Sequence, residues 1–283
     1  MATELVEMKS ISKTYGKVQA LAEVDMSVAK GEIVGLVGDN GAGKSTLVKI
    51  LSGVHPADSG EIYFKGQRAN FSNTMDAITA GIETIHQNSA LVEELSVARN
   101  LFLGREPTKM TGFVRRLDGE YMRSKTKALL QERVGLGREI DPESRVDALS
   151  GGERQSIAIA RAMFFEAELI ILDEPTNNLG LDETKGVLDF IRSARAAGHS
   201  SIFITHNTHH IFQVAGRIVV LRRGKKVGDV RRDETSVEEI EALITGTERL
   251  AESDGREAIG RKATTEAPRE GSVEKGPPAP NGR

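Results

Sequence analysis

Apolar and polar residues follow different patterns in different parts of this chain. Between residues 4 and 30 they alternate, and the alternation breaks at residues 15–17, which predicts antiparallel strands joined by a turn. An uninterrupted apolar run stands at residues 169–172, and the segment 201–205 has three consecutive apolar residues between a serine and a threonine. Such runs are typical of strands that are buried on both faces of a parallel sheet.

Shorter patterns of apolar and polar residues predict further strands and helices. The predicted strands and helices are a strand at 60–64, a helix at 75–80, a strand at 82–86, a hairpin pairing 218–221 with 226–230, and an amphipathic helix from Val237 to Ile244.

The pattern changes between residues 96 and 136. Strand signals vanish there, and charged, helix-forming segments flank a stretch broken by glycine and proline at 104–119. We predict a helical insertion, roughly residues 96–165, whose helices pack on each other rather than on the main sheet. Beyond residue 246 the apolar content falls away, so residues 250–283 are predicted to be a disordered tail.

Composition narrows the class of protein. The 283 residues are 39% hydrophobic and 28% charged, with a net charge of −3, which suits a soluble globular protein and disfavours a nucleic-acid binder. The absence of cysteine excludes disulfides and thiolate metal sites. The acidic N-terminus lacks an apolar core, and no stretch reaches the roughly 18 apolar residues of a membrane span. We therefore expect the protein on the cytoplasmic side.

A phosphate-binding loop carries the strongest chemical signal. Its glycines and its Lys-Ser pair fit the pattern G-x-x-x-x-G-K-[ST], between an apolar strand and a helical segment. Backbone N–H groups and the helix N-terminus would hold phosphate oxygens, Lys44 would reach the β- and γ-phosphates, and the Ser45 hydroxyl would ligate Mg²⁺. The predicted nucleotide-binding residues here are Gly38, Asp39, Asn40, Gly41, Ala42, Gly43, Lys44, Ser45 and Thr46.

Two acids follow the buried strand at 169–172. Asp173 is expected to hold Mg²⁺, and Glu174 is expected to polarise the attacking water. A phosphate loop and an acidic strand end together predict nucleotide hydrolysis rather than binding alone.

A third motif, residues 149–155, reads LSGGERQ and precedes a helical run. Ser150 and Glu153 have the spacing of a capping box. Gly151 and Gly152 weaken a helix start, which is reasonable if an anion must approach the backbone there. We therefore assign these four residues to nucleotide binding as well.

This combination resembles the signature of ATP-binding-cassette (ABC) proteins, over roughly residues 4–246. The resemblance implies a P-loop NTPase core with a mostly parallel sheet, an N-terminal antiparallel β-subdomain and a helical subdomain insertion. It also implies roles for single residues: Tyr15 would stack on adenine, Gln87 would ligate Mg²⁺ and sense a membrane partner, and His206 would contact the γ-phosphate. His209 and His210 match no family position and are expected on a helix surface.

The family mode of action implies partners. Two copies of the chain would sandwich ATP, so that the Ser150 segment of one closes over the triphosphate held by the other. The dimer would act with membrane permease subunits, peripherally on the cytoplasmic face, with an external or periplasmic sugar-binding protein and without nucleic acid. Glu174, His206 and Lys44 would be the catalytic residues.

One departure points to a subgroup. Gly180 stands where many family members carry an aspartate that couples the two sites of the dimer. This variation, with residues 38–41, 81–84, 103–106 and 205–207, resembles importers of the ribose, xylose and fructose type that carry one cassette. The predicted function is ATP-driven import of a monosaccharide such as fructose or ribose. A soluble ABC ATPase acting on ribosomes, a chromosome or DNA-repair ATPase and a non-transport regulatory nucleotide-binding subunit are the alternatives.

Overall fold

The structure is a computed structural model that describes residues 4–85, 91–111, 113–133, 140–165, 167–177 and 179–247. Met1–Thr245 forms one compact unit, and Gly246–Arg283 is a second segment. Gln87 and the predicted tail at 250–283 lie outside the described residues.

The N-terminal part is a four-stranded antiparallel sheet with the order β2-β1-β4-β5. Its strands are β1 (Glu4–Tyr15), β2 (Val18–Ala29), β4 (Ser59–Phe64) and β5 (Gln67–Ala69). The turn predicted at residues 15–17 lies between β1 and β2, where Gly16 has a left-handed backbone. The predicted antiparallel pair is therefore confirmed.

A six-stranded sheet forms the centre, in the order β12-β11-β3-β10-β9-β6. Its strands are β3 (Ile33–Val37), β6 (Ile82–Ile85), β9 (Leu169–Asp173), β10 (Ser200–Ile204), β11 (Arg217–Arg222) and β12 (Lys225–Arg231). Every neighbouring pair is parallel except the hairpin of β11 and β12. The sheet is thus mostly parallel, as predicted.

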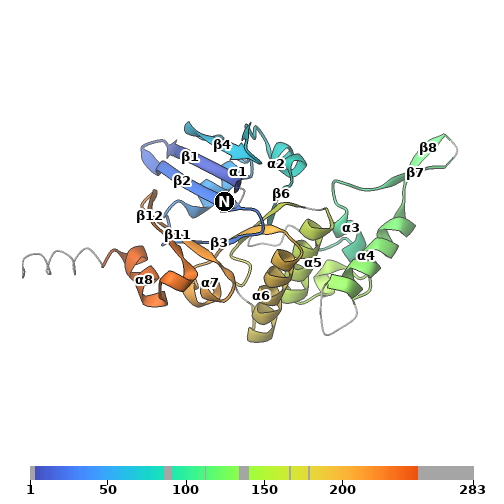
Figure 1. Cartoon of the computed structure of the whole chain (residues 1–283). Helices are drawn as coiled ribbons and strands as arrows, with labels where there is room; N and C mark the ends of the chain where they lie inside the picture. The colour runs from blue at the N-terminus through green and yellow to red at the C-terminus, as the bar shows by residue number, and fades with distance from the viewer. Residues whose placement is uncertain are drawn as a thin grey trace, which may run out of the picture. The chain divides into compact units, whose positions relative to one another are not determined.

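Both faces of this sheet are buried, which explains the uninterrupted apolar runs. Successive strand residues point to opposite faces, so Leu169 and Ile171 of β9 join the core beneath the antiparallel sheet, while Ile170 and Leu172 join the core beneath the helices. In Figure 1 the antiparallel sheet and α1 (Lys44–Leu51) cover one face of the central sheet, and α6 (Leu181–Ala196) and α7 (Thr208–Val214) cover the other.

The remaining helices complete the unit. They are α2 (Thr74–Ala80), α3 (Val97–Leu101), α4 (Gly119–Arg133), α5 (Gly151–Phe164), α6 (Leu181–Ala196), α7 (Thr208–Val214) and α8 (Val237–Thr245), with short 3₁₀ turns at Val146–Ala148 and Arg232–Glu234. The helices predicted at 75–80 and 237–244 are confirmed. Among the described residues, none of these helices combines the length and the apolar character needed to cross a bilayer.

The insertion differs from its prediction in two ways. Its helices do not pack only on each other, because Phe102 and Met122 belong to the same core as Ile170 of the sheet. In addition, the stretch at 104–119 contains the two-stranded hairpin of β7 (Thr108–Thr111) and β8 (Val114–Leu117), where no strand is predicted. Each strand has only four residues, too few for an alternation of apolar and polar residues to stand out in the sequence.

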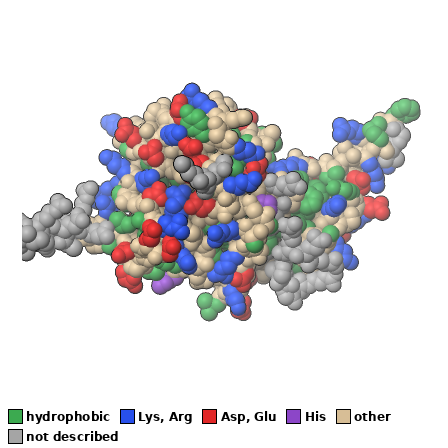
Figure 2. Space-filling view, in the orientation of Figure 1, with side chains coloured by type: hydrophobic (Ala, Val, Ile, Leu, Met, Phe, Trp, Pro, Cys, Tyr) green, Lys and Arg blue, Asp and Glu red, His purple; other side chains and the backbone are tan. Residues whose placement is uncertain are grey.

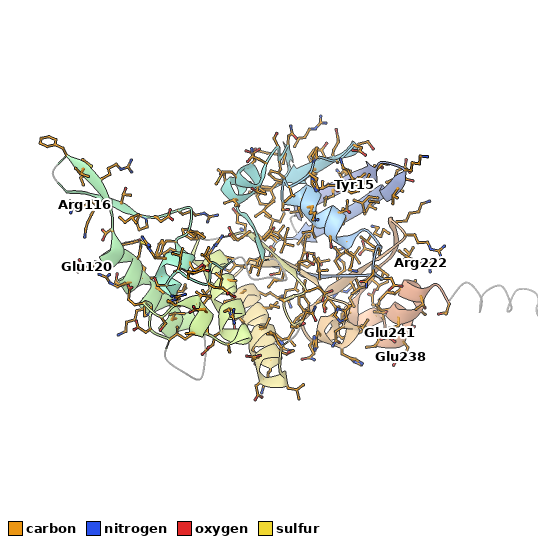
Figure 3. All side chains as sticks on the ribbon, turned by 180° about the vertical axis from the view of Figure 1, so that it is seen from behind. Tyr15, Arg116, Glu120, Arg222, Glu238 and Glu241 are labelled. Atoms are coloured by element: carbon orange, nitrogen blue, oxygen red, sulfur yellow. The ribbon has the colours of Figure 1, made fainter. Side chains whose placement is uncertain are left out.

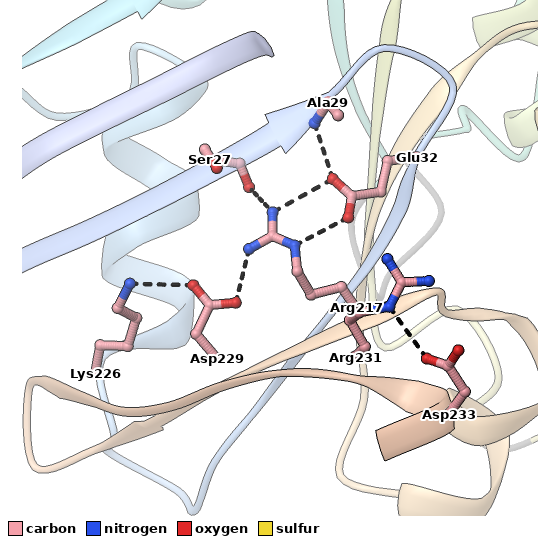
Figure 4. Close-up of polar contacts among 8 residues, drawn as sticks. All are labelled: Ser27, Ala29, Glu32, Arg217, Lys226, Asp229, Arg231 and Asp233. Atoms are coloured by element: carbon pink, nitrogen blue, oxygen red, sulfur yellow. Dashed lines mark hydrogen bonds and ion pairs between the residues drawn. The ribbon is translucent and has the colours of Figure 1, made fainter. Parts of the chain in front are cut away.

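A half-buried arginine joins the two sheets at the start of β3. Arg217 donates to both carboxylate oxygens of Glu32 (2.9 and 3.3 Å), to Oδ1 of Asp229 (2.7 Å) and to the Ser27 carbonyl (2.6 Å). Figure 4 shows this cluster between β2, the loop before β3 and the β11–β12 hairpin. Burial alone would lower the pKa of Arg217, but its hydrogen bonds to Glu32 and Asp229 outweigh burial and raise the pKa above its usual range.

Candidate functional site

Three predicted motifs meet at one edge of the central sheet. Strands β3, β10 and β9 are adjacent and parallel, so their carboxyl ends lie side by side. The phosphate loop follows β3, His206 is the second residue after β10, and Asp173 ends β9 in register with Ile204. The topology therefore brings together residues that are more than 160 positions apart in the chain.

Glycine is required at the two ends of the phosphate loop. Gly38 and Gly43 have positive φ angles of 150° and 106°. A Cβ atom on Gly38 would lie 2.2 Å from the Leu221 carbonyl oxygen, and one on Gly43 would lie 2.7 Å from the Ala20 carbonyl oxygen. Both the backbone conformation and the close packing thus exclude a side chain.

The helix after the loop has a bare N-terminus. No side chain caps α1, and no acidic residue lies in its first turn, whereas α2 and α3 are capped by Asn73 and Ser96. Unpaired N–H groups at a helix N-terminus attract anions. Ser45, in this first turn, is exposed to solvent.

Lys44 is buried with its amino group turned into the loop. Its Nζ donates to the carbonyls of Gly38 (2.6 Å) and Asp39 (3.0 Å). Burial lowers the pKa of Lys44, and the negative charges of Glu174, Asp173 and Asp39 oppose that shift. The ammonium group is thus held between the loop and the acidic end of β9.

Glu174 and His206 form a pair beside the loop. His206 Nδ1 lies 3.0 Å from Glu174 Oε2, and the Glu174 side chain is mostly buried while that of His206 is exposed. Glu174 has a left-handed backbone, with φ of 53°, and its N–H donates to the Ile204 carbonyl at 2.9 Å. A left-handed non-glycine residue costs free energy, and such strain is concentrated at functional sites.

A second histidine, His210, lies near this pair, although the sequence predicts it on a helix surface. His209 is exposed as expected, but His210 is half-buried and lies 3.0 Å from the Thr176 hydroxyl, which is itself buried. Burial lowers the pKa of His210, and the nearby His206 and His209 lower it further. The local sequence signal for this inward position is that His210 stands three residues after Asn207, which caps α7.

The signature segment has the capping geometry that its spacing predicts. Ser150 N–H donates to Glu153 Oε2 (2.8 Å), and Glu153 N–H donates to the Ser150 hydroxyl (3.3 Å). Ser150 and Gly151 are exposed, and Gly152 is buried.

Glu183, which sequence reasoning missed, links this segment to the start of α6. Its carboxylate accepts hydrogen bonds from the N–H groups of Gly180 (3.1 Å) and Gly152 (3.3 Å), and these bonds lower its pKa. A Cβ atom on Gly152 would lie 2.8 Å from the Glu183 side chain. The close approach of this carboxylate gives one structural reason for the second glycine of the motif.

Tyr15 lies at the end of β1, where it is 42% exposed. Its ring makes an edge-on contact with His55 and has the Lys13 ammonium 5.7 Å from its centre. Figure 3 shows Tyr15 on the antiparallel sheet. An exposed ring of this kind leaves a face for a planar ligand. Gln87, predicted to bind Mg²⁺, lies outside the described residues.

Comparison with known proteins decides the family. Residues 21–177 match the family model described as ABC transporter. The chain is 42% identical over 246 residues to the xylose/arabinose import ATP-binding protein of Sulfolobus acidocaldarius, covering 86% of this chain and 94% of that one. This chain belongs to the ABC transporter family. It is an ABC ATPase, as the motifs predicted.

Other relatives extend the likeness. The fructose import ATP-binding protein of Rhizobium meliloti is 40% identical over 263 residues, which are 92% of this chain and 99% of that protein. The ribose import ATP-binding protein of Rhizobium etli is 39% identical over 245 residues, which are 87% of this chain but 47% of that protein. This ABC chain thus spans about half of the ribose relative and nearly all of the other two.

Solved structures show the same fold. An ATP-binding cassette of an ABC transporter in its ADP conformation superposes with a TM-score of 0.72 at 24% identity, over 86% of this chain and 95% of that one. A dimeric cassette bound to ADP and phosphate gives a TM-score of 0.68 at 24% identity, over 80% of this chain and 98% of that one. The predicted ABC ATPase fold is confirmed.

Proposed function

We propose that this chain is the ATP-hydrolysing subunit of a membrane importer for a monosaccharide. The relatives that match it over nearly their whole length are named for import of xylose or arabinose and of fructose. Identities of 40–42% across the site and the insertion support a shared role.

The Glu174–His206 pair is the observation that carries hydrolysis. The pair lies at the sheet edge where the phosphate loop begins, and Glu174 is close enough to Lys44 to act on its pKa. The Glu174 carboxylate would accept a proton from the water that attacks the γ-phosphate, while Lys44 would hold the charge on the phosphate oxygens. His206 keeps the carboxylate oriented from the solvent side.

The residues present fit Mg²⁺. The Ser45 hydroxyl and the Asp173 carboxylate are oxygen donors of the kind this ion prefers, and Asp173 acts electrostatically on the loop lysine. No cluster of three His, Asp or Glu that would hold a metal by itself occurs in the described part of the chain. Such a sparse donor set suits an ion that keeps waters and substrate phosphates as ligands. When bound, Mg²⁺ would neutralise charge on the β- and γ-phosphates.

The working form would be a homodimer. The exposed Ser150 and Gly151 lie at a capped helix N-terminus, which is suited to an anion from outside the chain. In the proposed dimer this terminus closes over the triphosphate in the partner's loop. ATP would then bind the two copies together, and hydrolysis would separate them.

The dimer would act on permease subunits at the cytoplasmic face of the membrane, as a peripheral component. An external or periplasmic binding protein would deliver the sugar. Gly180, in place of an acidic residue, leaves the start of α6 to be organised by Glu183.

Co-purification tests this role. The tagged chain, expressed in its own host, should copurify with a multi-span membrane protein, and the reconstituted complex should hydrolyse ATP faster with sugar-loaded binding protein present. Recovery with ribosomes and without a membrane protein would contradict the transport role.

A further inference from the structure

The β7–β8 hairpin has no part in the ATP chemistry described above. Its four residue pairs run from Thr108–Leu117 at the base to Thr111–Val114 near the tip, and in the described residues it forms a sheet of two strands only. Figure 1 shows it projecting beyond α3 and α4, away from the central sheet. A two-stranded hairpin without a packed face is marginally stable in water.

The hairpin exposes large apolar side chains. Phe113, in the turn, is fully exposed, Met110 is 65% exposed and Val114 is 56% exposed. Leu117, at the base, is 46% exposed. Burying such side chains would release a substantial free energy, so this surface fits a partner that covers it.

Cations surround this apolar tip. Residues 108–117 contain Lys109, Arg115 and Arg116 and no acidic residue; Lys109 pairs with Asp118 at the base of the hairpin (3.2 Å), so the cations nearest the tip are the two arginines. Arg115 and Arg116 lie two and three residues from Phe113, or about 7–10 Å along an extended strand. Figure 2 shows hydrophobic and basic side chains gathered on this projection, and Figure 3 labels Arg116 on it.

The arrangement distinguishes between kinds of partner. Residues directly opposite in the hairpin share a face, so one face carries Met110, Arg115 and Leu117, and the other carries Lys109 with Val114 and Arg116. A protein groove would contact one face of the hairpin and leave the other face exposed to solvent. A lipid headgroup layer would surround both faces, with the apolar tip at the acyl boundary and the cations at the phosphates. The tip-to-cation spacing also agrees with the roughly 5–10 Å to which interfacial segments bury apolar residues.

We propose that the tip of the hairpin Thr108–Leu117 inserts into the anionic lipid surface of the membrane, with Arg115 and Arg116 on lipid phosphates. The inference rests on the proposed function only for the presence of a membrane nearby. It gives the ABC ATPase a second, lipid contact besides its permease partners.

Vesicle co-sedimentation of the purified full-length chain, without nucleotide, tests the proposal. The chain should bind vesicles of phosphatidylglycerol and phosphatidylcholine and should bind pure phosphatidylcholine much more weakly, because each cation near an anionic surface adds a factor of about 5 to partitioning. Arg115→Gln with Arg116→Gln should therefore weaken binding by about 25-fold. Phe113→Ser should weaken it by at least about 10-fold, from lost apolar burial.

Matched controls are available elsewhere on the surface. Met75, 58% exposed on α2, and Arg68, exposed on β5, can be changed to Ser and Gln without touching the hairpin. These variants should bind vesicles like the parent. ATPase activity should be unchanged in all four variants, because none alters the ATP site.

Three results would overturn the proposal. They are equal binding to both vesicle types, full binding by the Phe113→Ser variant, and a cross-linker at position 113 that labels only a permease subunit in native membranes. Loss of ATPase or transport with intact vesicle binding would instead count against the proposed function alone.

Discussion

Arg217 offers a test of how the fold holds the start of the phosphate-loop strand. The change Arg217→Met removes the one cation that joins Glu32 to Asp229 and leaves the Ser27 carbonyl without its donor. All three charged side chains are less than a third exposed. Removing one partner of such a cluster costs about 3–5 kcal/mol, since Glu32 loses its cation while it stays partly dehydrated, and only Asp229 keeps a second cation, Lys226 at 3.1 Å.

The size of the effect is measurable by urea and thermal unfolding. For a compact unit of this size, about 3–5 kcal/mol corresponds to a fall in Tm of roughly 6–20 °C. Arg231, also shown in Figure 4, pairs with Asp233 on the exposed surface, so Arg231→Met is the matched control and should leave Tm unchanged. If Arg217→Met lost less than about 1 kcal/mol at an unchanged m-value, the cluster would be no more than a surface ion pair, and the reasoning would be wrong.

Three further predictions concern the site. Lys44→Met should weaken ATP binding by at least about 10-fold in calorimetry, because a charge-assisted bond to phosphate is lost, and parental affinity would contradict its placement. Gly152→Ala should weaken ATP-driven dimerisation measured by light scattering, because the added Cβ would displace Glu183. The control Gly186→Ala, on the open face of α6, should dimerise like the parent. Equal dimerisation by the two variants would refute the steric argument. Because the pKa of Glu183 is lowered in the folded protein, its contribution to stability is complete above about pH 4.5 and is lost as the pH falls through the folded pKa. In chemical denaturation, the difference in unfolding free energy between the parent and Glu183→Gln should therefore shrink in acid. A difference that stays constant with pH would refute this prediction.

Local spacing predicted the parts of the site that depend on one stretch of chain. The phosphate loop and the capping box at Ser150 are short motifs whose geometry follows from residue types a few positions apart. The apolar run before Asp173 likewise predicted a buried parallel strand, because both faces of β9 are covered.

Contacts between distant segments could not be predicted in the same way. Glu183 approaches Gly152 across 31 positions, and Arg217 meets Glu32 across 185. Such pairs depend on how whole elements pack. The hairpin at Thr108–Leu117 was missed for a different reason: its strands have four residues each and expose both faces, so they lack the alternation that marks a half-buried strand.

Hydrolysis by the Glu174→Gln variant tests the central claim most directly. The substitution keeps the volume of the side chain and its place beside His206 but removes the base. ATPase activity should fall by at least about 100-fold, the usual contribution of a general base, and an ATP-bound dimer should accumulate in size-exclusion chromatography. Hydrolysis at the parental rate would contradict the assignment of Glu174 as the base.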